Sequence, residues 1–180
     1  MTKPRVLLIS GSLRAGSTNE AVIRAAEAET ALADSLVYGG MDALPHFNPD
    51  HDRDPLPAPV AALREAIDRA DALLICTPEY AGTLPGSFKN LLDWTVGGTE
   101  ISDKPTAWIN AAAVGRGGGA EATLRTVLGY TGAAIVEDAC LKIPIDRTFV
   151  DEHGRLTDEP SRQRVAEALK LLTGAVDDPV

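Results

Sequence analysis

Residues 5–26 read RVLLISGSLRAGSTNEAVIRAA, and this stretch decides the fold. The continuous apolar run at residues 5–9 is typical of a parallel strand that is buried on both faces. Residues 19–26 carry good helix formers behind two candidate N-caps, Ser17 and Thr18. The stretch therefore predicts a strand, a loop and a helix in succession.

The loop in the middle of this stretch has the chemistry of an anion site. The first turn of a helix leaves backbone N–H groups unpaired and carries the positive end of the helix dipole, which together stabilise a bound phosphate. Arg14 adds a positive charge whose forked geometry suits phosphate. Four further polar side chains can donate hydrogen bonds, namely Ser12, Ser17, Thr18 and Asn19. The alternative is an ordinary strand–helix connection with an N-cap, but so many phosphate-compatible side chains favour a ligand.

Length and charge narrow the class of protein. The 180 residues suit one domain over residues 1–180, without a linker-like stretch that would divide it. The net charge of −9 disfavours nucleic acid and anionic membranes as partners. The N-terminal residues lack the pattern of a signal peptide, and no stretch is long and apolar enough to span a bilayer. We therefore expect a cytoplasmic enzyme.

The cysteines and histidines do not predict a metal or redox centre. Cys76 and Cys140 are isolated from each other and lack the spacing of metal-binding or redox motifs, so we expect both to be buried as small apolar residues in or beside strands. His46, His51 and His153 are scattered through predicted loops. No side chain is nominated as catalytic on these grounds.

Strands and helices alternate along the rest of the chain. Further strands are predicted at residues 35–38, 72–77, 106–113 and 133–136. Helices are predicted at residues 18–31, 60–70, 120–130 and 161–172, and another opens near Pro85 with Thr83 or Leu84 close to its cap. Residues 41–59, rich in proline and aspartate, predict a surface excursion, and residues 151–160 a turn or short hairpin.

This alternation predicts a flavodoxin-like α/β fold, a three-layer sandwich in which helices cover both faces of a five-stranded parallel sheet with strand order 2-1-3-4-5. In that order the ligand crevice lies beyond the carboxyl ends of the first and third strands. Those ends carry residues 10–19 and 78–85, the two loops that composition alone sets apart. We therefore expect both loops at one site.

The motifs in these loops resemble those of the NADPH-dependent FMN reductase family. The pattern Gly-Ser-x-Arg-x-x-Ser-x-Asn stands at residues 11–19. The pattern Pro-Glu-Tyr-Asn-x-x-x-Pro-Gly-x-x-Lys-Asn-x-x-Asp-Trp stands at residues 78–94, with Ala81 in place of the asparagine. A glycine-rich turn at residues 114–119 and the pair Leu124-Arg125 complete the resemblance, which covers nearly the whole chain.

The resemblance implies FMN as cofactor and NADPH, or NADH, as co-substrate. It assigns the FMN phosphate to Ser12, Arg14, Ser17, Thr18 and Asn19, and the ring system to Pro78, Glu79, Tyr80, Ala81, Gly82, Thr83, Ala113 and Gly115. Backbone amides of the second loop can serve the ring without a side chain, so the loss of asparagine at Ala81 is tolerable. The alternatives are that Tyr80 covers the strand end and that Lys89-Asn90 is a solvated helix face. Glu79 is interpreted as structural, at a subunit contact.

The implied activity is transfer of electrons from NAD(P)H through FMN to a small-molecule acceptor such as a quinone, free flavin, azo compound or metal oxyanion. Hydride passes from nicotinamide to flavin, so we expect ping-pong kinetics. A homodimer or homotetramer is implied by the resemblance alone. The alternative from another class is a non-enzymatic electron carrier of flavodoxin type, although the first loop lacks the pattern of flavodoxins.

Residues 115–120 offer one competing interpretation. They match the pattern G-x-G-x-x-A between a predicted strand and a predicted helix, and Glu137 follows at the spacing of a dinucleotide fingerprint. Such a fingerprint normally follows the first strand, whereas this one follows the fourth. We therefore favour a turn that permits close approach to the flavin or the nicotinamide.

Overall fold

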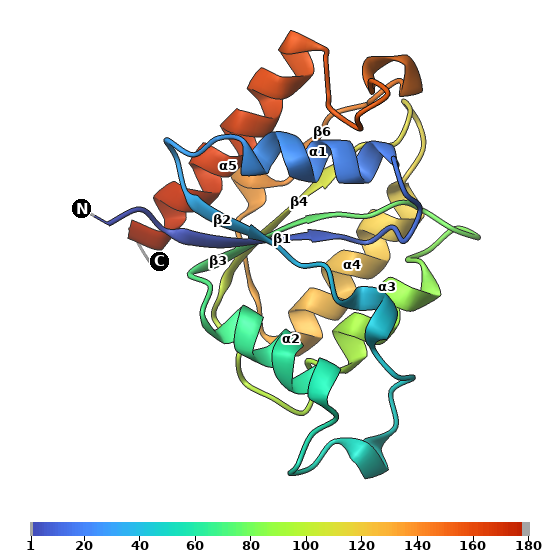
Figure 1. Ribbon diagram of the computed structural model, residues 1–180, viewed down its shortest axis with the longest axis vertical. Helices are drawn as coiled ribbons and strands as arrows, with labels where there is room; N and C mark the ends of the chain where they lie inside the picture. The colour runs from blue at the N-terminus through green and yellow to red at the C-terminus, as the bar shows by residue number, and fades with distance from the viewer. Residues whose placement is uncertain (1, 178–180) are drawn as a thin grey trace.

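The sheet has the predicted parallel strand order β2-β1-β3-β4-β5. The computed structural model, which describes residues 2–177, shows this sheet between two helical layers (Figure 1). Its first five strands are β1 (Arg5–Ser10), β2 (Asp34–Val37), β3 (Ala72–Cys76), β4 (Pro105–Asn110) and β5 (Ala134–Ile135). The flavodoxin-like α/β sandwich is thereby confirmed.

The edge of the sheet beside β4 differs from the prediction, because a sixth strand was missed. β5 pairs with the start of β4, and β6 (Leu141–Lys142) pairs with its end, where Ile109 lies opposite Leu141. A turn of 3-10 helix, Glu137–Ala139, separates the two pieces. Each piece has two residues, which is too short for a strand pattern to be read from sequence.

Two helices cover one face of the sheet and three cover the other. In Figure 1, α1 (Thr18–Glu27) and α5 (Glu159–Asp177) lie above the strands, and α2 (Ala58–Asp68), α3 (Gly86–Asp93) and α4 (Gly118–Thr131) lie below them. Strand residues alternate between the two layers: Val6 and Leu8 face α1 and α5, and Leu7 and Ile9 face the other three. Both faces of β1 are therefore buried, as its apolar run predicts.

Several helix boundaries depart from the prediction. α1 ends at Glu27 instead of residue 31, because residues 28–33 turn back so that Asp34 can pair with Arg5 of β1. α3 begins at Gly86 with Pro85 as its cap residue, so Thr83 and Leu84 lie outside it. α5 extends beyond the predicted residues 161–172 at both ends. Boundaries depend on caps and tertiary pairing that periodicity does not record.

The long excursion after β2 is surface structure anchored on α3. It contains two 3-10 turns, Met41–Ala43 and Pro49–His51. Asn90 accepts a hydrogen bond from the Phe47 N–H at 2.7 Å and donates to the Pro45 carbonyl at 2.9 Å, where Trp94 Nε1 also donates. Asn90 is thus a structural anchor rather than part of a solvated helix face.

A buried ion pair fixes the other end of this excursion. Arg64 on α2 binds Asp52 at 2.6 Å and donates from Nε to the Trp94 carbonyl at 3.0 Å.

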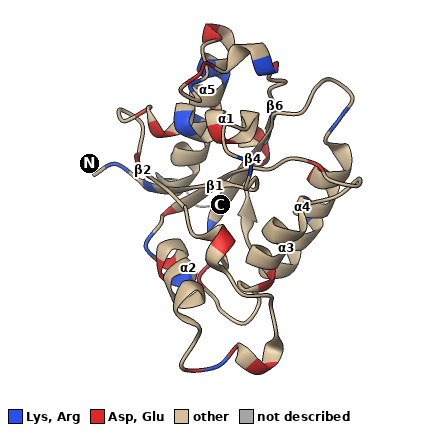
Figure 2. Ribbon diagram, turned by 45° about the vertical axis from the view of Figure 1, so that its right-hand side comes forward, with Lys and Arg blue, Asp and Glu red and all other residues tan. Residues whose placement is uncertain are grey.

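Around the molecule, acidic and basic residues are interspersed along the helices and connecting loops (Figure 2). Within residues 2–177 no helix has the length and apolar character needed to cross a membrane.

Candidate functional site

The loops that follow β1 and β3 lie side by side, as the strand order predicts. The Gly11 N–H donates to the Cys76 carbonyl at 2.9 Å, which continues the pairing of the two strands. A Cβ added at Gly11 would lie 2.2 Å from Thr77 Oγ1, so this contact requires glycine. The loops at residues 10–19 and 78–85 therefore start from adjacent strand ends.

The first loop presents a row of backbone donors. Ser17 caps α1, since its Oγ accepts from the Glu20 N–H at 3.1 Å. The Gly16 N–H donates to the Glu20 carboxylate at 3.0 Å, and Arg24 binds the other oxygen of that carboxylate at 2.6 Å. Within residues 2–177, five backbone N–H groups of this loop have no hydrogen-bond partner: those of Leu13, Ala15, Ser17, Thr18 and Asn19. Such a row of donors at a helix N-terminus fits an anion.

The predicted phosphate-binding side chains do not all face the same way. Arg14 is exposed, and its guanidinium makes no ion pair with any residue between 2 and 177. Ser12 Oγ accepts from the Arg14 N–H at 3.2 Å. Asn19 is buried, and its Oδ1 accepts from the Cys76 thiol at 3.3 Å, so this oxygen faces the sheet. Burial raises the pKa of that thiol, which keeps it protonated as a donor.

A shallow cavity of about 280 Å³ opens beside this loop. Ser12, Arg14 and Glu20 line one side, and Tyr38 and Asp42, beyond the end of β2, line the other. Burial, with a smaller contribution from Asp42, raises the pKa of Tyr38 to about 12, so its hydroxyl is a neutral donor at physiological pH. The cavity joins the anion loop to the carboxyl end of β2.

The second loop makes a two-residue turn with unusual backbone angles. Tyr80 and Thr83 exchange both backbone hydrogen bonds, at 2.9 and 3.1 Å. The residues between them, Ala81 and Gly82, have φ of 51° and 77°, which identifies a type I′ turn. Asn-Gly is the pair such turns prefer, because asparagine tolerates positive φ better than alanine does. The asparagine replaced by Ala81 thus matters for the backbone itself.

This turn is tied to the N-terminus of α4. Glu79 Oε2 accepts from the Gly119 N–H at 2.7 Å and from the Ala120 N–H at 3.1 Å. The hydroxyls of Thr83 and Thr123 form a further hydrogen bond of 2.9 Å. Because these donors of α4 are bonded to Glu79, and Glu137 is paired with Arg125, the structure argues against a dinucleotide fingerprint at residues 115–120.

The third loop, between β4 and α4, brings Ala113 and Gly115 to the same edge. Asn110 Oδ1 accepts from the Ala112 N–H at 3.1 Å, and its Nδ2 donates to Glu121 at 3.2 Å. A Cβ at Gly117, where φ is 81°, would lie 2.4 Å from Asn110 Oδ1. Asn110 therefore organises this loop, although its place in a buried strand run gave no sequence signal for that role.

Each of the three loops exposes a large apolar side chain. Leu13, Tyr80 and Val114 are 56%, 51% and 88% exposed. Apolar groups exposed together at one edge of a sheet mark a surface for a flat apolar partner, a ring system included. The edge thus combines an anion site with apolar surface.

Among the described residues no group of three or more histidine, cysteine, aspartate or glutamate side chains gathers to hold a metal.

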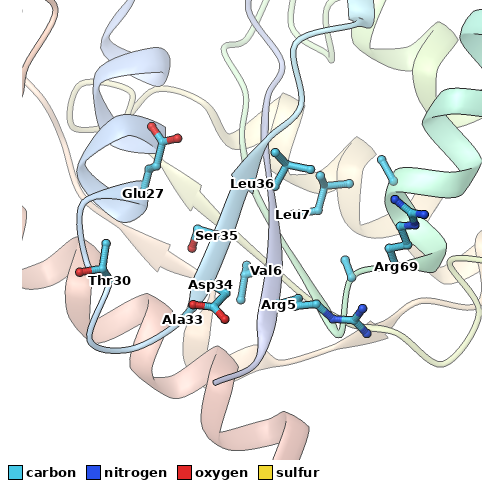
Figure 3. Close-up of a pocket in the computed structure, with 12 residues that line it drawn as sticks. Arg5, Val6, Leu7, Glu27, Thr30, Ala33, Asp34, Ser35, Leu36 and Arg69 are labelled. Carbon is cyan, nitrogen blue, oxygen red and sulfur yellow. The ribbon is translucent and has the colours of Figure 1, made fainter. Parts of the chain in front are cut away.

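A cavity of about 800 Å³ lies elsewhere. It surrounds the first residues of β1 and β2, at the opposite end of the strands from the three loops (Figure 3). Its guanidinium groups are engaged, since Arg5 pairs with Asp71 at 3.0 Å and Arg69 with Glu65 at 3.1 Å. Volume alone therefore does not identify the functional site.

Residues 4–148 match the NADPH-dependent FMN reductase family. The chain belongs to this family. An NAD(P)H-dependent FMN reductase of Pseudomonas aeruginosa is 35% identical over 172 residues, which cover 93% of this chain and 92% of that one. A 2-hydroxy-1,4-benzoquinone reductase of a Burkholderia species is 30% identical over 163 residues, 88% of each chain.

The fold of a flavoenzyme NAD(P)H:(acceptor) oxidoreductase from Paracoccus denitrificans is also similar. The TM-score is 0.83 with 27% sequence identity, and the match covers 97% of each chain. The family resemblance seen in the loop motifs is therefore confirmed over residues 4–148, and the similarity of fold extends over 97% of the chain.

The residues present fit the cofactor of the family. The unpartnered N–H groups at the start of α1, together with Arg14, suit the phosphate of FMN. Tyr80, Ala113 and Gly115 lie exposed on the neighbouring loops, where a ring would find apolar surface. Sequence reasoning missed Asn110, Gly119 and Thr123, which support these loops from β4 and α4. The run of glycines indicated that another group approaches the backbone closely near Gly119, whereas nothing in the sequence pattern singled out Thr123.

Proposed function

We propose that this protein is an NAD(P)H-dependent FMN oxidoreductase whose site is the edge formed by the three loops. Among residues 2–177, the N–H groups of Leu13, Ala15, Ser17, Thr18 and Asn19 have no partner and lie next to exposed apolar loops, which is the observation that carries the proposal. Family membership supports the enzyme over the electron carrier, since the curated relatives are reductases.

The protein's own residues bind and orient. The backbone N–H groups of Thr18 and Asn19, at the N-terminus of α1, and the guanidinium of Arg14 would hold the phosphate, because all of them can donate to an anion. The turn at residues 80–83 and the loop at residues 113–115 would flank the ring. FMN, when bound, supplies the chemistry that takes hydride from NAD(P)H and passes electrons on. No side chain is assigned as a general acid or base.

The acceptor is a small molecule, and we propose a quinone in view of the benzoquinone reductase among the relatives. We further propose that the protein acts in the cytoplasm as a homodimer or homotetramer. Analytical ultracentrifugation of the FMN-loaded protein checks the assembly, and a monomer would contradict it.

The test is a visible spectrum of the purified protein with FMN. We expect a bound-flavin spectrum that bleaches on anaerobic addition of NADPH and recovers when benzoquinone is added. Protein that binds no FMN would refute the proposal. Protein that binds FMN but turns over neither NADPH nor NADH with any acceptor would favour the carrier instead.

A further inference from the structure

Glu79 has an arrangement that the proposed function does not use. Its side chain is half-buried, and one oxygen, Oε2, accepts from both the Gly119 and the Ala120 N–H, at 2.7 and 3.1 Å. These are donors of the first turn of α4, where the helix dipole favours a negative charge. Glu79 is 40 residues away from this helix turn in sequence, so the bond joins two separate loops of the site.

Two further contacts hold the same turn on the same helix. A Cβ at Gly119 would lie 2.0 Å from the Gly82 carbonyl oxygen, so the turn and the helix touch backbone to backbone. The Thr83 and Thr123 hydroxyls bond at 2.9 Å. The turn at residues 80–83 is thus fastened to α4 at three points, of which Glu79 supplies the charged one.

Two of the four backbone donors of this turn have no hydrogen-bond partner among the described residues. The N–H groups of Tyr80 and Thr83 each donate to the carbonyl oxygen of the other residue, whereas the N–H groups of Ala81 and Gly82 have no partner within residues 2–177. Donors that are held in place before a ligand arrives stabilise it more than donors that must first be ordered. Because the turn is held on α4, the Ala81 and Gly82 N–H groups are positioned before a ligand binds to them.

We propose that Glu79 is a positioning residue for the flavin ring. By bridging from the second loop to α4, it holds the Ala81 and Gly82 N–H groups in one orientation toward the ring. This inference rests on the proposed function, because it needs FMN at this edge. It differs from the expected role of Glu79 at a subunit contact, since the partner of its carboxylate lies within the same chain.

Three variants separate the reach of this side chain from its charge. Glu79→Gln keeps an oxygen at the same distance, and because one oxygen makes both bonds, the amide oxygen can replace it without a charge. Glu79→Asp keeps the charge but is shorter by one methylene. Glu79→Ala removes both. If position is what matters, the glutamine variant resembles the wild type and the other two do not.

Two readouts follow the effect. In the FMN-free protein, amide hydrogen exchange of Gly119 and Ala120 is expected to stay slow in Glu79→Gln and to become fast in Glu79→Ala. In the FMN complex, the alanine and aspartate variants are expected to raise the dissociation constant by about tenfold. Their visible spectrum should also lose the resolved shoulder of an immobilised flavin, whereas Glu79→Gln should retain it.

Asp158 provides the matched control, because it is a carboxylate at the N-terminus of α5. Its Oδ2 accepts from the Ser161 N–H at 3.0 Å and from the Ser161 hydroxyl at 2.6 Å. Asp158→Ala should lower the melting temperature and leave the flavin spectrum and affinity unchanged. A cap that only stabilises a helix would give this same result at Glu79.

The outcomes distinguish the inference from the proposed function. Wild-type protein that binds no FMN overturns both. Wild-type protein that binds FMN while Glu79→Ala binds it with the same affinity and spectrum overturns the positioning role alone. Glu79→Asp behaving as wild type while Glu79→Gln loses affinity also overturns it, since charge would then decide. If Glu79→Ala does not fold, the glutamine and aspartate variants give the same discrimination.

Discussion

The N-termini of α1 and α4 both have backbone N–H groups that the helix itself leaves unpaired and a nearby carboxylate, but the carboxylate is placed differently at each. At α1 the carboxylate is Glu20, which belongs to the first turn of the helix and is held on the surface by Arg24. At α4 it is Glu79, which arrives from another loop. At α1 several N–H groups have no partner in the part of the chain that the structure describes, whereas at α4 the carboxylate accepts from the Gly119 and Ala120 N–H groups. One helix end is therefore suited to bind a ligand and the other to hold loops together.

Arg14→Ala tests the ligand-binding end and should have the largest effect. Loss of a charge-assisted hydrogen bond to phosphate costs about 1.5–3 kcal/mol, so the FMN dissociation constant should rise at least about tenfold. Stability without FMN should not change, because the Arg14 side chain is exposed. Fluorescence titration measures the affinity, with Arg164→Ala on α5 as the charge-matched control. An unchanged dissociation constant would remove Arg14 from the site.

Gly119→Ala tests the loop-holding end through sterics. The added Cβ would collide with the Gly82 carbonyl oxygen, and such overpacking costs about 1–3 kcal/mol of unfolding free energy. Gly129→Ala, in the same helix with open space around it, should instead stabilise by about 0.5–1 kcal/mol. Urea unfolding compares the two. Equal effects at both positions would show that the turn does not pack on α4.

Ala81→Asn tests the strain in the turn that α4 holds. Alanine at φ of 51° is disfavoured by about 1 kcal/mol, which asparagine partly relieves. We expect a gain in unfolding free energy of up to about 1 kcal/mol. The same change at Ala15, an exposed loop residue whose φ is negative, should give no gain. A destabilised Ala81→Asn would contradict the type I′ assignment.

Glu20→Gln should have the smallest effect. The loss of a carboxylate from the first turn of α1 should lower stability by about 0.3–1 kcal/mol. FMN affinity should not fall, because a negative charge beside the phosphate is removed. Thermal unfolding and FMN titration measure the two quantities. An FMN affinity that falls would mean that Glu20 supports the cofactor, as is proposed for Glu79.

The sequence predicted the sheet order and the placement of the two loops because both follow from short, strongly patterned segments. The apolar run of β1 and the polar residues after it carry that information locally. The tie between Glu79 and Gly119 joins residues far apart in the chain, and no periodicity encodes such a bond. The interrupted β5–β6 edge was missed for a related reason, since its pieces are held by pairing with β4. The orientation of Asn19 depends likewise on Cys76 beneath it.

The anchoring of the excursion on α3 has a consequence for how this family is recognised. The second half of the motif at residues 78–94 includes Asn90 and Trp94, whose polar groups bind the backbone at Pro45 and Phe47. Asn90 and Trp94 therefore contribute to the motif by holding a loop in place and not by contacting the flavin. If the residues around Arg14 bind the phosphate as proposed, a chain that kept Asn90 and Trp94 but lost those residues would still match the motif in part without binding the phosphate of FMN. To recognise a reductase that binds FMN, the motif at residues 11–19 is therefore more informative than the end of the motif at residues 78–94.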